Sequence, residues 1–197
     1  MAFAAPVVLE GRHVRLEPLA REHEAGVRAA AADGELWSLW YTSVPSPEGT
    51  ASWIDTAFDM RDRLGALPFV IRETATGDIV GSTRYFNVDA VNRRLEIGHT
   101  WYAKRVQRTA VNTECKLLLL THAFETLDCV AVEFRTSFFN FASRDAIARL
   151  GAKQDGILRN HQILPDGTLR DTVVFSIIAG EWPAVKRHLR YRLERPR

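Results

Sequence analysis

The chain has 197 residues, of which 46% are hydrophobic and 25% are charged, and its formal net charge is +2. This balance is typical of a folded globular protein and excludes disordered and membrane proteins. The small charge favours no nucleic-acid partner, and the sequence shows neither a signal peptide nor an apolar run of roughly 20 residues. We expect a cytoplasmic protein that binds neither nucleic acid nor membrane. Residues 1–197 should form a single domain with a core over about 12–180.

The first part of the chain predicts one strand and two helices. Alternating apolar and polar residues indicate a strand over 13–19. A short helix over 21–33 ends at an Asp-Gly pair, and the aromatic loop over 35–49 contains prolines and serines that exclude a long element. Apolar residues at helical spacing then predict a helix over 50–64.

Three strands follow with short connections, so we expect them to pair as an antiparallel meander. They cover 68–73, 79–88 and 94–102. After them the sequence predicts a helix over about 109–127, a strand over 129–137, a helix over about 143–150, strands over 156–164 and 171–178, and a basic helix over 181–195. The strand–helix–strand unit over 95–137 requires a parallel neighbour and a right-handed crossover. The expected fold class is α+β, with a mixed, mostly antiparallel sheet of six to seven strands flanked by helices.

The segment RVQRTAVNTE, residues 105–114, joins a buried strand to a long apolar helix. The unpaired amides of a first helical turn, together with the helix dipole, make such a join an anion site. Thr109 and Ala110 are small enough to let a phosphate approach the backbone, and Arg105 and Arg108 add charge at the rim. The same residue types also cap ordinary helices, so the segment alone leaves capping and phosphate binding open.

Four stretches carry a resemblance to a known family: GRHVRLEPL, GDIVGSTRYF, LEIGHTWYAKRVQRTAVNTECKLLLL and NFASRDAIARLGAKQDG. In them the chain resembles the GNAT superfamily of N-acetyltransferases, and within it the branch of RimJ and RimL type ribosomal-protein N-terminal acetyltransferases. The resemblance implies a fold in which acetyl-CoA (coenzyme A) enters a gap between two splayed central strands. It also implies acetyl transfer to an amine acceptor, either a protein N-terminus or a small amine or amino acid.

The family's pyrophosphate loop has the pattern Q/R-x-x-G-x-G/A, which here reads Arg105-x-x-Arg108-x-Ala110. Arg108 replaces the central glycine, so a positive φ at this position would carry strain; we expect CoA binding to survive. Asn140 matches a family asparagine that contacts CoA, while Asn140 and Ser143 are equally suited to cap the next helix. The cofactor contacts that the resemblance implies are His99, Thr100, Trp101, Arg105, Gln107, Arg108, Thr109, Ala110, Val111, Asn112, Asn140 and Ser143.

Transfer to an amine requires a neutral amine and stabilisation of the developing charge, but no covalent nucleophile. We therefore expect Cys115 to belong to the core. Glu96 is the first candidate for the base, although an outward-facing glutamate paired with a neighbouring arginine is the alternative; His99 is a second candidate. Many relatives place a tyrosine acid at the position of Ile147, so Ser143, a water or another tyrosine replaces it, or CoA leaves as the thiolate.

The acceptor pocket is expected to use aromatic and basic residues, through cation–π contact or burial of an apolar group. The candidates are Trp37, Trp40, Tyr41, Arg84 and Tyr85, for which ordinary core packing is the alternative. A rival function is a GNAT-fold module that binds CoA or acyl-CoA without turnover. A dinucleotide-binding oxidoreductase is disfavoured because the chain contains no G-x-G-x-x-G. No metal site is expected, and a homodimer stays open.

Overall fold

The computed structural model describes residues 3–195, which form a mixed sheet of eight strands in the order β1-β2-β3-β4-β5-β6-β8-β7. The strands are β1 (Leu9–Glu10), β2 (Val14–Pro18), β3 (Leu67–Glu73), β4 (Ile79–Asp89), β5 (Arg94–Tyr102), β6 (Ala131–Ser137), β7 (Lys153–Ile163) and β8 (Leu169–Ile178). Neighbours pair antiparallel except β5 and β6, which are parallel. The expected meander and the parallel crossover are both confirmed, and the fold class with them.

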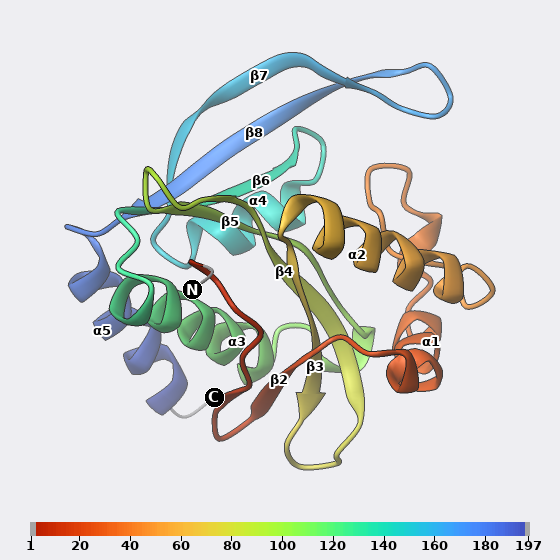
Figure 1. Ribbon diagram of the computed structural model, residues 1–197, viewed down its shortest axis with the longest axis horizontal. Coiled ribbons are helices and arrows are strands. Elements are labelled where there is room, and N and C mark those ends of the chain that lie inside the picture. The colour runs from red at the N-terminus through yellow and green to blue at the C-terminus, as the bar shows by residue number, and fades with distance from the viewer. Residues whose placement is uncertain (1–2, 196–197) are drawn as a thin grey trace.

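Helices cover both faces of this sheet (Figure 1). They are α1 (Glu24–Ala32), α2 (Thr50–Leu64), α3 (Ala110–Thr121), α4 (Phe141–Ala148) and α5 (Trp182–Glu194). Helix α3 lies against the face that carries Tyr85, and α2 lies against the face that carries Arg84. Within residues 3–195, none of the helices has the length and apolar character needed to cross a membrane.

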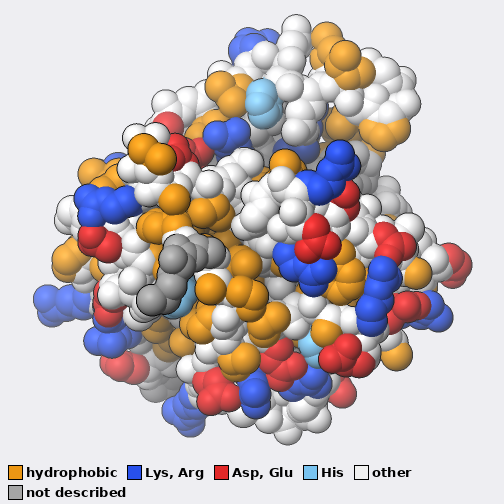
Figure 2. All heavy atoms as spheres, in the orientation of Figure 1, with side chains coloured by type: hydrophobic (Ala, Val, Ile, Leu, Met, Phe, Trp, Pro, Cys, Tyr) orange, Lys and Arg blue, Asp and Glu red, His pale blue; other side chains and the backbone are white. Residues whose placement is uncertain are grey.

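The β7–β8 hairpin rises away from the rest of the sheet in Figure 1, and β7 forms its edge. Hydrophobic side chains gather at its tip (Figure 2), where Ile163 is 77% exposed and Leu169 is 52% exposed. The base of β8 returns to the centre of the sheet, where it pairs with β6. Strand β8 therefore contributes Val173, Phe175 and Ile177 to the core, whereas β7 and the tip of the hairpin stand outside it.

Element boundaries differ from the sequence prediction in a few places, each with a local cause. The two-residue β1 adds an eighth strand to the six or seven that were expected. Helix α3 ends at Thr121 and passes into a π-helical turn over His122–Thr126. Helix α4 begins earlier than expected, at Phe141, because the Asn140 side chain caps it by accepting from the Ser143 amide.

Two irregularities in the central strands position the site. Strands β5 and β6 pair only from Arg94 to Glu96, although β5 continues to Tyr102, so within the described residues their remaining lengths part. Between β4 and β5 the register shifts twice, which leaves His99 and Asn87 in bulges with φ of 48° and 47°. Bulges bend a strand and re-aim its side chains, and both of these lie next to the place where the strands part.

Candidate functional site

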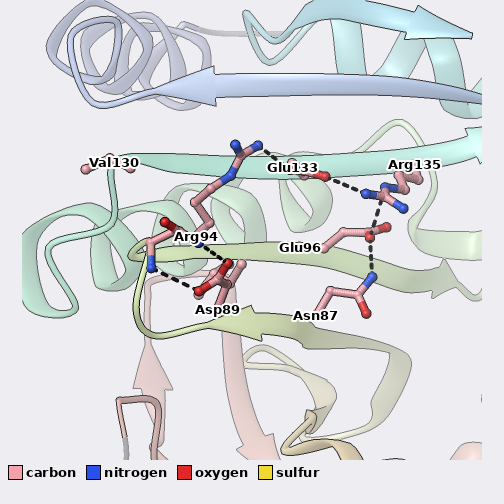
Figure 3. Close-up of a pocket in the computed structure, with 9 residues that line it drawn as sticks. Asn87, Asp89, Arg94, Glu96, Val130, Glu133 and Arg135 are labelled. Carbon is pink, nitrogen blue, oxygen red and sulfur yellow. Dashed lines mark hydrogen bonds and ion pairs between the residues drawn. The ribbon is translucent and has the colours of Figure 1, made fainter.

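A polar pocket of about 840 Å³ opens beside Glu96, at the start of the parallel pair (Figure 3). The Glu96 carboxylate accepts a hydrogen bond from Asn87 Nδ2 at 2.9 Å. Arg135 Nε lies 3.4 Å from the same oxygen, and Arg135 also bonds Glu133, which pairs in turn with Arg94. The pocket is lined by Asn87, Asp89, Asn92, Arg94, Leu95, Glu96, Val130, Glu133 and Arg135.

Glu96 is held in a state that can exchange a proton near neutral pH. It is only 2% exposed, and burial raises its pKa to about 7, against the opposing effects of Asn87 and Arg135. The outward-facing orientation of the alternative is not found, because Glu96 is buried; the pairing with an arginine is found, through Arg135 of the neighbouring strand β6 rather than through Arg93 or Arg94. A carboxylate with this pKa, facing a pocket, is suited to general-base work.

His99 lies on the same side of the sheet, in the β5 bulge. Its ring packs edge-on against Phe86, with the centroids 5.0 Å apart. Burial, with smaller contributions from the charges of Arg84 and Arg170, lowers the pKa of His99 to about 4. The imidazole is therefore neutral at physiological pH and a weaker base than Glu96.

Arg84 is a buried cation on the face covered by α2. Its side chain is 1% exposed, and its guanidinium carbon lies 4.9 Å from the ring centroid of Trp53. Nη1 contacts Met60 Sδ at 3.0 Å, while Nε is buried without a hydrogen-bond partner. Burial lowers the pKa of Arg84 to about 10, so the group stays charged at neutral pH.

Tyr85 does not belong to an acceptor pocket, which corrects the sequence expectation. It points to the opposite face of the sheet from Arg84, because successive side chains of a strand alternate. Its ring is fully buried against Phe69, and its hydroxyl donates to the carbonyl of Leu119 in α3 at 2.5 Å. Tyr85 is a core residue.

The aromatic loop is not among the residues that line the Glu96 pocket. Trp40 is 54% exposed, and its ring contacts those of Tyr41 and Phe139, with centroids 5.5 and 5.6 Å away. Phe139 belongs to the turn between β6 and α4, so Trp40 and Tyr41 lie toward that turn. The half-buried Trp37 is also outside the pocket lining. The ring that stacks on Arg84 comes from α2, from a residue that the sequence indicated only as helix packing.

The segment before α3 has the geometry of an anion-binding helix start. Arg108 has a φ of 62°, the strained conformation expected where the family pattern has glycine. Thr109 is the N-cap, and its hydroxyl accepts from the Val111 amide at 3.3 Å. Gln107 donates to the carbonyl of Tyr102 at 3.1 Å, which ties the loop to the end of β5. The first-turn amides of Ala110 and Asn112 belong to the same helix start.

Arg105 does not direct its charge into this loop. Its guanidinium pairs with Glu73 at 2.6 Å and with Asp78 at 3.1 Å, and both carboxylates belong to the β3–β4 hairpin. These partners neutralise the charge and fasten the loop to the sheet. The charge that was expected to attract a phosphate is therefore engaged in ion pairs that hold the loop in place.

Beyond Glu96, the backbone edge of β5 that faces β6 has no strand partner within residues 3–195. The side chains of this part of β5 pack against other residues of the protein. Trp101 packs edge-on against Trp53, with the centroids 6.0 Å apart. Thr100 Oγ1 lies 2.7 Å from Thr83 Oγ1 and accepts from Lys116 Nζ at 2.8 Å. Burial lowers the pKa of Lys116 to about 8. A pantetheine arm can pair with such a free strand edge through its amides.

The start of α4 closes the far end of the gap between the strands. Asn140 Oδ1 accepts from the Ser143 amide at 3.0 Å, which confirms the capping interpretation and leaves the Asn140 NH₂ group as a donor. Ser143 lies beyond the carboxyl end of β6, whereas Glu96 pairs with Glu133 near its start. The two residues predicted to be catalytic thus lie at different depths of the gap. Ile147 is buried and supplies no proton.

These features fit a CoA-type cofactor: a helix start that offers amides to a pyrophosphate, and an unpaired strand edge that leads from it toward Glu96. Both cysteines are free and buried, in line with the expected core role of Cys115. In the part of the chain that the structure describes, no group of three or more His, Cys, Asp or Glu side chains is arranged to hold a metal ion.

Sequence reasoning missed several residues of the site: Trp53, Asn87, Lys116, Arg135 and Arg170. The direction of the Asn87 side chain is set by a β-bulge, and no glycine at that point of the sequence predicts the bulge. Arg135 and Arg170 belong to β6 and β8, which are distant from Glu96 in the sequence and come near it only because of the strand order in the sheet. An alternating strand pattern shows which residues share a face, but it does not show which distant strand supplies their partners.

Comparison with known proteins identifies relatives along most of the chain. Residues 13–153 match the family described as "Acetyltransferase (GNAT) domain". The Bacillus subtilis (strain 168) protein named "Putative ribosomal N-acetyltransferase YdaF" is 32% identical over 110 residues, and this match spans 56% of the present chain and 59% of that relative's length. A GCN5-related N-acetyltransferase structure from Brucella melitensis is 29% identical, with a TM-score of 0.87 over 98% of this chain and 87% of that one. Mycobacterium smegmatis RimJ, solved in complex with CoA-disulfide, shares the fold at 22% identity, with a TM-score of 0.78 over 95% of each chain.

Proposed function

The chain belongs to the GNAT acetyltransferase family, and we propose that it is an acetyl-CoA-dependent N-acetyltransferase whose acceptor, a primary amine, attacks the acetyl group directly. The acceptor is a protein N-terminus or a small amine or amino acid. The observation that carries this proposal is Glu96, a buried carboxylate with a pKa of about 7 that faces a polar pocket where β5 and β6 part.

Bound acetyl-CoA supplies the thioester whose acetyl group is transferred. The amides of Ala110 and Asn112, with the Arg108 backbone, would hold its pyrophosphate at the start of α3. The free edge of β5 from His99 to Trp101 would pair with its pantetheine arm. The Asn140 NH₂ group, which the cap leaves available as a donor, would contact it from α4. RimJ, which has the same fold, provides a precedent for CoA in this architecture.

Glu96 would remove the proton from the acceptor ammonium, directly or through a water. Its pKa near 7 lets it be ionised at neutral pH and still be a strong enough base to take the proton. Asn87 fixes the orientation of the carboxylate through its 2.9 Å hydrogen bond. Arg135 contacts the same carboxylate oxygen and is itself held by an ion pair with Glu133.

The rival candidate is a module of the same fold that binds CoA or acyl-CoA without turnover. The strained Arg108 and the apolar Ile147 favour it, because both depart from the family pattern. The polar pocket beside Glu96 favours the enzyme, because a pure CoA-binding module has no need of a buried base beside an acceptor-sized pocket.

The deciding experiment measures thiol release from acetyl-CoA with a panel of amines and short peptides, for the wild type and for Glu96→Gln. Calorimetric titration with acetyl-CoA runs in parallel. We expect the wild type to bind and turn over, and Glu96→Gln to bind with similar affinity while losing ~100-fold or more in kcat, the usual contribution of a general base. Binding without turnover in the wild type would establish the rival.

A further inference from the structure

Two arginines, Arg84 and Arg170, lie close enough to the neutral His99 to act on it electrostatically. Arg84 pairs in register with Gly98, and Phe86 pairs with Glu96, so Arg84 and Glu96 point to the same side of the sheet. Arg170, from β8, acts electrostatically on both Glu96 and His99. Arg84 thus shares the face of Glu96, and Arg170 reaches the same region from β8 by its charge.

The two arginines that line the pocket, Arg94 and Arg135, are balanced by carboxylates, whereas Arg84 and Arg170 lie outside its lining. Arg94 pairs with Glu133, and Arg135 is shared between Glu133 and Glu96. The charges of Arg94 and Arg135 are therefore neutralised by ion pairs between β5 and β6. They leave little attraction for an anionic ligand.

Arg84 and Arg170 differ from them. Among residues 3–195 no carboxylate forms an ion pair with Arg84, whose contacts are the Trp53 ring and Met60 Sδ. Arg170 Nη1 donates to the Gln162 side chain at 2.9 Å, and the Nε atoms of Arg84 and Arg170 are both buried without hydrogen-bond partners. A buried guanidinium without a counter-ion is costly to keep. For Arg84, an anion brought by a ligand would offset this cost, whereas Arg170 already has the attraction of Glu96.

We propose that Arg84 and Arg170 bind a carboxylate of the acceptor, so that this protein acetylates amines that carry a carboxylate close to the reacting nitrogen. The inference rests on the proposed function, because it assigns the substrate class of the same site. Glu96 and Gly98 lie about 7 Å apart along the strand, given a rise of roughly 3.3 Å per residue. That spacing suits an amine at Glu96 and a carboxylate a few bonds away at Arg84. A free amino acid and an acidic N-terminal residue of a protein both provide this chemistry.

The test compares acceptors of matched size with and without the carboxylate. Serine is matched with serinamide, and the tripeptide Asp-Ala-Ala with Asn-Ala-Ala, each measured for calorimetric binding and for thiol release with acetyl-CoA. We expect the carboxylated member of one pair to be preferred by about tenfold or more, as charge-assisted bidentate hydrogen bonds provide. Preference within the serine pair identifies a small amino acid as acceptor. Preference within the peptide pair identifies an acidic N-terminus.

Variants then assign the preference to the two arginines. Arg84→Gln and Arg170→Gln should each remove most of it, while Arg63→Gln on α2 and Arg159→Gln on β7 serve as controls, because those side chains are 74% and 78% exposed. Arg84→Lys keeps the charge without the guanidinium fork and should retain only part of the preference. Circular dichroism checks folding, and if Arg84→Gln does not fold, Arg84→Lys and Arg170→Gln decide.

The outcomes separate the inference from the proposed function. Equal treatment of both members of each pair by the wild type, or a preference that survives in the Arg84 and Arg170 variants, overturns the inference. If acetyl-CoA still binds and an uncharged amine is still acetylated, the proposed function stands without it. Absence of acetyl-CoA binding and of thiol release with every amine overturns the proposed function and the inference with it.

Discussion

Glu96 and Glu133 occupy opposing positions on the parallel strands β5 and β6, and they form the last pair before the strands part. Arg135 lies between their carboxylates and contacts both. Of the two carboxylates, Glu133 forms a second ion pair, with Arg94. Among the described residues Glu96 forms none beyond Arg135, and it is more deeply buried and faces the pocket. The same pair of strands thus provides one carboxylate that fixes the wall and one that is ready to accept a proton.

The first prediction concerns the pH dependence of acetyl transfer. Because burial raises the pKa of Glu96 to about 7, kcat/KM should rise with pH through that value and then level off. Glu133→Gln should move this rise to lower pH, because the Glu133 charge raises the pKa of Glu96. Glu96→Gln should remove it. Initial rates between pH 5 and 9 give the profile, and an unchanged rise in Glu96→Gln would assign it to another group.

The second prediction concerns stability. The folded-state pKa of Glu96, about 7, lies above the ordinary glutamate pKa of 4.5, so its stabilising contribution is present below pH 4.5 and is lost as pH rises through 7. Glu96→Gln cannot ionise and escapes this loss. The variant should match the wild type near pH 4.5 and exceed its free energy of unfolding by about 1–3 kcal/mol at pH 8.5. Urea unfolding at the two pH values measures the difference; a Glu96→Gln variant that is less stable at pH 8.5 would contradict it.

Local patterns in the sequence were enough to place most elements. The helix over Thr50–Leu64 appears with its predicted bounds, because its apolar spacing is regular and Gly65, with a φ of 67°, ends it. The parallel crossover was also predictable, because a strand, a long helix and another strand allow one right-handed arrangement. The positive φ at Arg108 followed from its place in a glycine position.

The site was less predictable, for two physical reasons. Arg84 and Tyr85 were both expected in the acceptor pocket, although adjacent strand residues point to opposite faces, and the alternation alone excludes one of them. The burial of Glu96 had no local signal, because it depends on Asn87 in a bulge and on Arg135 from a strand beyond the crossover. Long-range partners of this kind are set by register, which the local pattern leaves open.

The third prediction isolates the backbone strain at Arg108. Arg108→Gly and Arg108→Ala both remove the same side chain, so they differ only in the Cβ atom at a φ of 62°. Glycine adopts this conformation without the clash that alanine suffers, and Arg108→Gly should be the more stable by about 1 kcal/mol. Thermal unfolding of the two variants measures the difference. Equal stability would show that the loop relaxes around the Cβ.

The fourth prediction separates the two roles of Asn140. Asn140→Ala removes the cap on the Ser143 amide and should cost about 1 kcal/mol of stability, together with the amide donor for CoA. Asn140→Asp keeps a carboxylate oxygen for the cap but replaces the NH₂ donor with an acceptor. We therefore expect Asn140→Asp to unfold like the wild type and yet bind acetyl-CoA as weakly as Asn140→Ala, with calorimetry and thermal unfolding as the measurements. Wild-type affinity in Asn140→Asp would restrict Asn140 to capping, because the donor is then not used by the cofactor.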